Sequence, residues 1–462
     1  MSYESSQRLG RFDHTVNLQR RKLLRGLAAA GAGSATLGAL TQFASLATAA
    51  EDYRALVCVF MYGGNDSNNL LVPTDTATYA QYAAPRPNLA LGRDQVLPIA
   101  GNNGDGHTYG LHPSFTNLRS LYTQGKATVI ANAGTLLTPT DLTQWNNGAN
   151  LPVNLFSHAD QQGQWQSAVS DGNGRNGWGG RMLERLLDVG LTNRGYGALS
   201  VTGGNLWEAS DGSLVPYKVS ASGNFGFGFY DPTQPNADPL STAIHATLTE
   251  ARPHLFEQAW LDVMGRSLEA QRVLATAVNA NSVSTVFPDT DLGRQLRMAA
   301  RLISARTSLG LKRQCIFCSI GGFDTHGDDQ LYRQQSNFAE MDAAINAFYQ
   351  ATVEMGIAPN VTLFTASDFN RTLVSNGQGS DHAWGGHHLV VGGSVQGNKL
   401  VGSFPNLAIN GPSDAGEGRW IPTTAVTQIG ATLGKWFGAS DAQLDEVFPR
   451  LANFNRDLGF MA

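Results

Sequence analysis

The chain has 462 residues, of which 15% are charged and 42% are hydrophobic, and its formal net charge is −5 at pH 7. This composition is typical of a globular protein and excludes a chain that is disordered throughout. Because the net charge is negative and no stretch is rich in Lys and Arg, we do not expect nucleic acid as a partner.

The N-terminal segment has the features of an export signal. Arg20 and Arg21 stand side by side, and a long stretch without charge then ends in alternating small residues up to Ala49. This pattern predicts a twin-arginine signal peptide over residues 1–49, cut near Ala49. The alternative is a retained transmembrane anchor, although Gly and Ser make the segment only weakly apolar.

Export would make residues 50–462 a periplasmic or secreted protein, with the twin-arginine export machinery as a partner. The mature chain contains no second stretch that is long and apolar enough to cross a bilayer. We therefore expect no membrane span in residues 50–462.

Continuous apolar runs that end in Gly or polar residues predict strands buried on both faces. Helical patterns over residues 292–303 and 338–348 precede two of these runs. Alternation of strands and helices predicts an α/β fold, a doubly wound and mostly parallel sheet with helices on both faces. The predicted strands lie in residues 53–66, 127–134, 314–324, 361–369 and 387–395.

The middle of the chain has a different pattern. Residues 171–290 begin in a loop rich in Gly and Asn and then carry helical patterns with few clear strands. We interpret this region as a helical insertion or cap on the sheet.

The three cysteines all lie in apolar runs that predict strands. Cys315 and Cys318 are three apart, and residues three apart in a strand face opposite sides. The pattern therefore favours buried free thiols over a disulfide or a zinc site.

Carboxylates and imidazoles gather where the predicted strands end, which is the edge where parallel sheets bind ligands. Mixed imidazole and carboxylate ligands suit Zn, Mn or Fe better than Ca, and this set could hold one or two ions. The candidate metal ligands are Asp66, Asp324, His326, Asp368, His382 and His388. Arg371 follows Asp368 closely and could hold an anionic oxygen of a substrate.

Each candidate has a simpler structural interpretation. Asp66 and Asp368 could cap a turn or helix, with Arg371 as the partner of Asp368. Asp324 and His326 could be a hydrogen-bonded pair within a loop. His388 follows another histidine in a strand, so only one of the two would face the site.

Ser157 is the candidate nucleophile. It stands beside His158 at the start of a helical pattern, where a hydroxyl could be activated by a bound metal. The alternative is that Ser157 only caps the helix, and the two roles are compatible because a helix N-terminus also favours an anion.

The motifs "GGND", "SHADQQ", "GGFDTH", "SDFNRT" and "GSDHAWGGHH", in this order behind a twin-arginine leader, resemble a family of exported bacterial proteins. That family is domain of unknown function 1501, within the alkaline phosphatase and sulfatase superfamily. The resemblance covers about residues 53–460. It implies an alkaline-phosphatase-like domain with one or two metals, which hydrolyses or transfers a phosphate or sulfate ester through a metal-bound Ser or Thr.

The resemblance also implies residue roles. Asp66 resembles the metal ligand after the first strand, and Ser157 resembles the nucleophile. Asp324 and His326 resemble the Asp/His pair of one metal. Asp368 resembles part of the Asp-His pair of the other, and His382 resembles the late histidine ligand, with His388 as its alternate.

This sequence departs from the pattern in three places. Asp324 and His326 are two apart, where the well-studied enzymes space the pair Asp-x-x-x-His. Phe369 stands where those enzymes have the His of an Asp-His pair. The exported family typically has Glu in place of Asp368 and Arg in place of Phe156.

The sequence predicts an exported, metal-dependent hydrolase of a small phosphate or sulfate ester. The alternative is an exported binding or assembly protein in which a degenerate metal site is structural. A phosphomutase or transferase is a third possibility.

Overall fold

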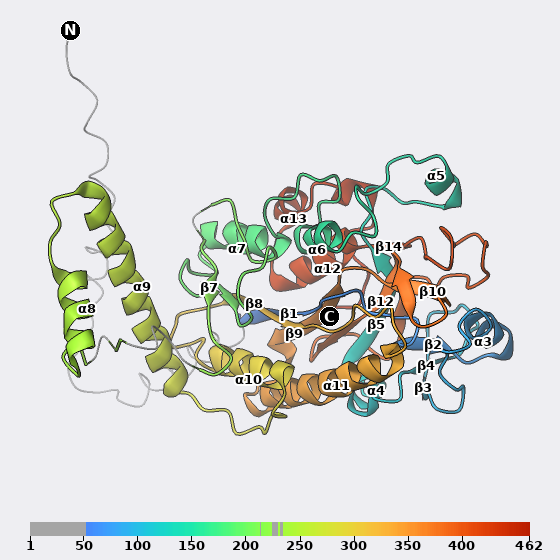
Figure 1. The fold of residues 1–462 in the computed structure, drawn as a ribbon, viewed down its shortest axis with the longest axis horizontal. Helices are drawn as coiled ribbons and strands as arrows, with labels where there is room; N and C mark the ends of the chain where they lie inside the picture. Colours follow the sequence, from blue (N-terminus) through green and yellow to red (C-terminus); the bar gives the residue numbers. More distant parts are fainter. Residues whose placement is uncertain (1–51, 213, 224–229, 232–233) are drawn as a thin grey trace, which may run out of the picture. The chain divides into compact units, whose positions relative to one another are not determined.

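The computed structural model describes residues 52–462 except 213, 224–229 and 232–233 (Figure 1). Residues Tyr53–Ala462 form one compact unit. The predicted signal peptide, residues 1–49, lies outside the described residues and stays a prediction. Within the described residues, no helix has both the length and the apolar character needed to cross a membrane.

A mostly parallel central sheet forms the core of the unit, which confirms the predicted α/β fold. Its strands lie in the order β13-β5-β12-β9-β1-β8-β6-β7, with β14 also paired to β5. They are β1 (Arg54–Met61), β5 (Ala127–Gly134), β6 (Ala198–Ser200), β7 (Tyr217–Lys218), β8 (Arg313–Ile320), β9 (Val361–Ser367), β12 (Gly386–Gly392), β13 (Leu400–Val401) and β14 (Thr424–Ala425). All five predicted strands are among them.

The central strands run parallel, but β12 is reversed. β1 lies between β8 and β9 and is parallel to both, whereas β12 is antiparallel to β9 and to β5. The chain passes from β9 to β12 through the antiparallel pair β10 (Arg371–Ser375) and β11 (Ser380–His382). Because this connection contains no crossover helix, β12 returns in the opposite direction.

Helices cover both faces of the sheet, as the apolar strands require (Figure 1). Val57 and Val59 of β1 pack with α4, α10 and α11 on one face, and Leu56 and Phe60 pack with α6, α7, α12 and α13 on the other. Alternate side chains of a strand face opposite ways, so each face has its own hydrophobic cluster. The helices are α4 (Thr116–Thr123), α6 (His158–Ser167), α7 (Trp178–Asp188), α10 (Asp291–Ser304), α11 (Gln330–Glu354), α12 (Val426–Phe437) and α13 (Asp441–Val447).

The helical patterns at residues 292–303 and 338–348 fall inside α10 and α11. The side chain of Thr290 caps α10 by accepting a hydrogen bond from the amide of Gly293. α11 begins at Gln330, directly after the loop that follows β8. The helix therefore fixes the far end of that loop.

Smaller elements lie outside the central layers. β2 (Leu71–Pro73), β3 (Leu97–Ile99) and β4 (Tyr109–Leu111) form a separate antiparallel sheet. The remaining helices are α3 (Thr76–Ala83), α5 (Leu142–Asn146), α8 (Pro239–Thr249) and α9 (Leu255–Asn279), with single turns η1 (Ala358–Asn360) and η2 (Leu451–Asn453).

Residues 171–290 contribute to the sheet as well as covering it. This region contains α7, β6, β7, α8 and α9, and β6 pairs in parallel with β8. The sequence did not reveal β6 and β7 because each is too short to show a strand period.

The cysteines are free and buried, as predicted. Cys315 lies in the cluster on one face of the sheet and Cys318 in the cluster on the other. The spacing of three residues therefore separates the two thiols.

A buried carboxyl group, Glu208, gives the fold a pH dependence. It is fully buried, and its Oε2 accepts from Nδ2 of Asn205 at 2.8 Å. Burial raises the pKa of Glu208 from 4.5 to about 8, against the opposing effect of the Asn205 amide. The folded protein therefore keeps a proton that the unfolded chain loses above pH 4.5.

We expect Glu208→Gln to make the melting temperature less dependent on pH. In the native protein, the contribution of Glu208 to the free energy of unfolding is fully present below pH 4.5, the pKa in the unfolded chain. It is lost as the pH rises toward about 8, the pKa in the folded protein. The variant should match the native protein near pH 4 and melt a few degrees higher at pH 9. Scanning calorimetry across this range checks the expectation, and equal slopes of melting temperature against pH would contradict it.

Candidate metal centre

Loops from distant parts of the chain meet at the carboxyl edge of β1, β8 and β9. The loop after β1 runs close to the loop after β8, because a Cβ on Gly63 would lie 2.3 Å from the amide nitrogen of Asp324. The φ of Gly63 is +112°, which also favours glycine. The Gly-Gly pair after β1 therefore allows a close approach that brings Asp324 to the site.

Three side chains at this edge could hold one metal ion. His158, Asp324 and His382 each offer a ligand atom, and these atoms lie within 4.8 Å of one another. Nε2 of His158 lies 3.6 Å from Oδ1 of Asp324, and Nε2 of His382 lies 3.9 Å from the same oxygen. α6 supplies the first ligand, the loop after β8 the second, and β11 the third.

Both imidazoles are oriented by their other ring nitrogen. Nδ1 of His158 lies 2.6 Å from Oδ2 of Asp368, and Nδ1 of His382 lies 2.8 Å from the carbonyl oxygen of Phe156. A carbonyl can only accept, so Nδ1 of His382 carries the proton and Nε2 keeps its lone pair. The same holds for His158 when Asp368 is ionised.

Both Nε2 atoms are buried and have no hydrogen-bond partner among the described residues. Buried polar atoms are normally paired, and two unpaired imidazole nitrogens beside one carboxylate are a donor set that suits a metal ion. Burial lowers the pKa of His382 to about 4, which keeps the ring neutral at physiological pH. A neutral imidazole is the form that binds a metal.

Asp368 contacts the ring nitrogen of His158 that does not face Asp324. Its Oδ2 also accepts from Nε2 of Gln162 at 2.9 Å and from the amide of Gly63 at 3.2 Å. Burial raises the pKa of Asp368, although the hydrogen bonds from Gln162 and His158 oppose the shift. A carboxylate bound to the second nitrogen of a histidine ligand fixes the tautomer and orientation of the ring. Asp368 thus contacts the candidate ligand His158 and is not one of the grouped ligand atoms, while its predicted role as a ligand stays a prediction.

The guanidinium of Arg371 makes its hydrogen bonds to other groups of the protein. Its Nε donates to the carbonyl of Gly64 at 3.1 Å, and Nη2 donates to the carbonyl of Gly63 and to Oδ1 of Asp324, both at 2.6 Å. Nη1 donates to the carbonyl of Ser380 at 2.9 Å and faces the ring of His326 at 3.3 Å. Four of the five N–H donors of the guanidinium are thus bonded to protein oxygens, and the fifth faces the His326 ring.

In this structure Arg371 holds Asp324 through a hydrogen bond and an ion pair, and its binding of a substrate oxygen stays a prediction. The side chain of Asp324 is 55% exposed, whereas that of Arg371 is fully buried. Partial burial acts to raise the pKa of Asp324, but the hydrogen bond and charge of Arg371 outweigh it, so the net shift is downward. Asp324 is thus held ionised and open to solvent, as a metal ligand should be.

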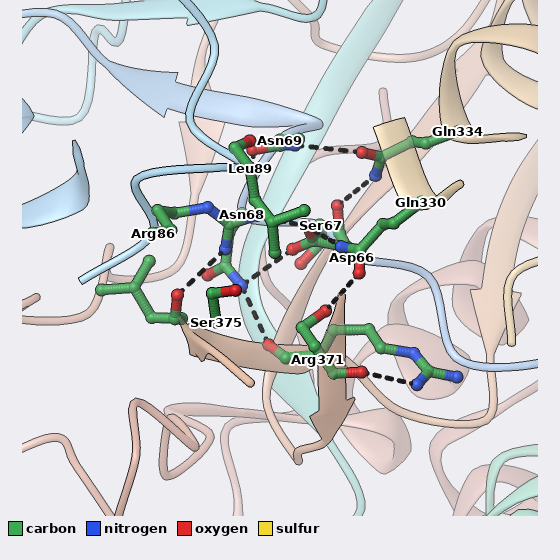
Figure 2. Close-up of polar contacts among 12 residues, drawn as sticks. Asp66, Ser67, Asn68, Asn69, Arg86, Leu89, Gln330, Gln334, Arg371 and Ser375 are labelled. Carbon is green, nitrogen blue, oxygen red and sulfur yellow. Dashed lines mark hydrogen bonds and ion pairs between the residues drawn. The ribbon is translucent and has the colours of Figure 1, made fainter. Parts of the chain in front are cut away.

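Asp66 belongs to a buried network that reaches the backbone carbonyl of Arg371 through Asn68 (Figure 2). Its Oδ2 forms an ion pair with Arg86 and accepts from Nε2 of Gln330 at 2.7 Å, while its Oδ1 accepts from Nδ2 of Asn68 at 2.9 Å. Nε2 of Gln334 donates to the backbone carbonyl of Asp66. With these partners, the carboxylate ties the loop after β1 to α11 and is not one of the grouped ligand atoms.

The two remaining predicted histidine ligands, His326 and His388, are not among the grouped ligand atoms. His326 is 45% exposed, with Nδ1 at 3.0 Å from Oδ1 of Asp324 and Nε2 at 4.0 Å from Oδ1 of Asp381. His388 is buried in β12, where its ring lies against Trp165 with the centroids 4.5 Å apart. Burial lowers the pKa of His388 to about 3. The structure does not place His388 in the group of ligand atoms.

Ser157 stands at the N-terminus of α6, next to His158. Its hydroxyl makes no capping hydrogen bond to the helix. Instead, Oγ donates to Oδ2 of Asp160 at 2.6 Å, and Oδ1 of Asp160 accepts from Nδ2 of Asn154 at 3.0 Å. The simple capping interpretation therefore does not describe this hydroxyl, which is partly exposed beside a candidate ligand.

His158 is the ligand that sequence reasoning missed. The pattern of strand ends does not single it out, because α6 follows β5 only after a long loop. The available signal was the adjacent pair Ser157-His158 at the start of a helix. Two imidazoles and one carboxylate match the three protein ligands of catalytic zinc sites, which keep a further position open. The residues present thus fit a divalent ion.

Comparisons with known proteins bear on the family. Residues 53–448 match the family described as "Protein of unknown function (DUF1501)". A comparison with curated proteins finds no match. The fold is similar to lipoteichoic acid synthase LtaP from Listeria monocytogenes, with 8% identity and a TM-score of 0.34 over 84% of this chain and 72% of that chain. It is also similar to the PsFucS1 sulfatase from Pseudoalteromonas sp., with 10% identity and a TM-score of 0.36 over 87% of this chain and 71% of that chain.

Structural likeness this weak says nothing about activity. The family match is different, because it spans nearly all of the described residues and includes every motif that resembled the family in the sequence. The chain belongs to the DUF1501 family.

Proposed function

We propose that the protein is an exported, metal-dependent hydrolase of a small phosphate or sulfate ester. His158, Asp324 and His382 would hold the metal, and Ser157 would attack the ester. The observation that carries this proposal is the pair of buried, unpartnered Nε2 atoms that lie beside Oδ1 of Asp324.

Each surrounding residue has a role in this proposal. Asp368 orients His158, the carbonyl of Phe156 orients His382, and Arg371 fixes Asp324. A divalent ion bound by the three ligands would supply Lewis-acid stabilisation of the charge that develops on the ester oxygens. Zn, Mn and Fe suit this donor set.

Ser157 would open the reaction. Its Oγ forms the new bond to phosphorus or sulfur while the bond to the alcohol oxygen breaks, and the hydroxyl proton of Ser157 passes to that alcohol oxygen. Water then releases the acid and restores the hydroxyl. The Ser157 hydroxyl donates to Oδ2 of Asp160, and the lone pairs of Oγ stay available for attack. The overall reaction consumes one water and gives an alcohol and a phosphate or sulfate.

Ser157→Ala tests the nucleophile. We expect turnover of p-nitrophenyl phosphate or p-nitrophenyl sulfate, whichever the native protein hydrolyses, to fall at least about 1,000-fold. Metal content should stay unchanged, because Ser157 is not one of the three ligands. Ser440→Ala is a matched control, since Ser440 also begins a helix but caps α13 away from this group.

The results also decide the alternative functions. Turnover that survives in Ser157→Ala would contradict the nucleophile assignment. Full metal content with no hydrolysis of any ester, together with a lower melting temperature after chelation, would favour the binding protein with a structural metal. Product formation that depends on an added alcohol acceptor would indicate a transferase.

A further inference from the structure

The turn that leads into Ser157 has an unusual backbone conformation. Phe156 has a φ of +71° and Asn154 a φ of +50°. Asn adopts the left-handed region fairly often, but a bulky aromatic residue rarely does. Such residues persist only where the surrounding structure holds them, and they concentrate at functional sites.

Contacts from three directions hold Phe156. Its amide donates to Oε1 of Gln161 at 2.6 Å, and its carbonyl accepts from Nδ1 of His382 at 2.8 Å. Its ring lies under the guanidinium of Arg419, whose Cζ is 5.4 Å from the ring centroid. The ring of Trp145 meets it edge-on, with the centroids 6.2 Å apart.

Arg419 contacts both Phe156 and His382. While its guanidinium covers the ring of Phe156, its Nε donates to the backbone carbonyl of His382 at 2.8 Å. The outer side of the guanidinium is paired with Glu417 at 2.6 Å. One side chain therefore holds both the turn before Ser157 and the strand that carries His382.

We infer that Phe156 is a positioning residue of the metal centre, and that its left-handed turn sets the tautomer of His382 as well as the direction of Ser157. The positive φ points the carbonyl of Phe156 at Nδ1 of His382. That contact keeps the proton on Nδ1 and leaves Nε2 as the ligand atom. The inference rests on the proposed metal site and adds the residue that couples the nucleophile to a ligand.

Phe156→Ala and Phe156→Gly separate the backbone from the side chain. Both remove the ring, but only glycine adopts a positive φ without cost. We expect Phe156→Gly to bind Zn²⁺ about 5- to 30-fold more tightly than Phe156→Ala, the factor that corresponds to the cost of a left-handed residue. Arg419→Gln should weaken Zn²⁺ binding, whereas Arg456→Gln, at a surface pair with Asp445, should not.

The tautomer of His382 can be measured directly. Nitrogen-15 NMR of the metal-free protein should show His382 protonated on Nδ1, and in Phe156→Ala a mixture of tautomers. Protonation on Nε2 in the native protein, or equal Zn²⁺ affinity in the alanine and glycine variants, would overturn the inference. Failure of the native protein to bind any metal would instead overturn the proposed function, while the His382 tautomer would still test the role of Phe156.

Discussion

Replacing His158 by alanine should lower the affinity of the protein for Zn²⁺ at least about 100-fold, because losing even a supporting residue of a metal ligand costs 10- to 100-fold. His158 supplies one of three grouped ligand atoms, and Asp368 holds its ring from behind. Removing the ring leaves two ligands and a buried carboxylate without its imidazole partner. Ester hydrolysis should be lost with the metal.

Isothermal titration of metal-free protein with Zn²⁺, together with elemental analysis, measures this effect. His107→Ala is the control, since His107 is an exposed histidine paired with Asp75 in another part of the unit. If His158→Ala keeps full metal content and affinity, the ion lies elsewhere, and His326 with Asp381 would be the next group to change.

Much of the fold could be predicted because its central strands are buried on both faces. Such strands are continuous apolar runs, and β5 spans the same residues, 127–134, that the pattern indicated. The direction of β12 could not be predicted this way. It depends on the hairpin β10–β11, whose two short strands carry no clear period in the sequence.

The candidate site could be predicted in part. The rule that ligands bind at the carboxyl ends of strands located Asp324. His382 was a candidate just before the fifth predicted strand, and both residues lie in the group of ligand atoms. The rule could not locate His158, because α6 reaches the edge after a long loop. The rule also does not distinguish a carboxylate that binds a metal from one that accepts a hydrogen bond from a histidine ligand. Asp368 is such a case, since both roles need a carboxylate at the same edge of the sheet.

Asp66 shows a further reason why the sequence predicted the candidate site only in part. A carboxylate after a buried strand is equally suited to a metal and to a buried arginine. Its partner Arg86 is 20 residues further on, in a turn after α3, and only tertiary packing brings the two together. Arg371 is a similar case, because its acceptors are mostly backbone carbonyls, which leave no mark in a sequence.

Arg86→Ala is expected to destabilise the fold by about 3–5 kcal/mol, the typical cost of leaving one member of a buried ion pair unpaired. The side chains of Arg86 and Asp66 are 0% and 1% exposed, so the carboxylate would have to stay charged without solvent or be protonated. Gln330 and Asn68 would remain as neutral donors (Figure 2). Urea denaturation gives the change in unfolding free energy.

Two further variants test whether the Asp66–Arg86 pair stabilises the fold or takes part in metal binding. Arg294→Ala removes an exposed arginine paired with Asp289 and Asp291 and should cost less than about 1 kcal/mol. The double variant Asp66→Asn with Arg86→Met leaves no charge buried, so it should cost less than Arg86→Ala alone. It should also keep the full metal content, because Asp66 is bound by Arg86 and not grouped with the ligands. Loss of metal from Asp66→Asn, with little change in stability, would return Asp66 to the ligand set and show that Arg86 moves away when the ion binds.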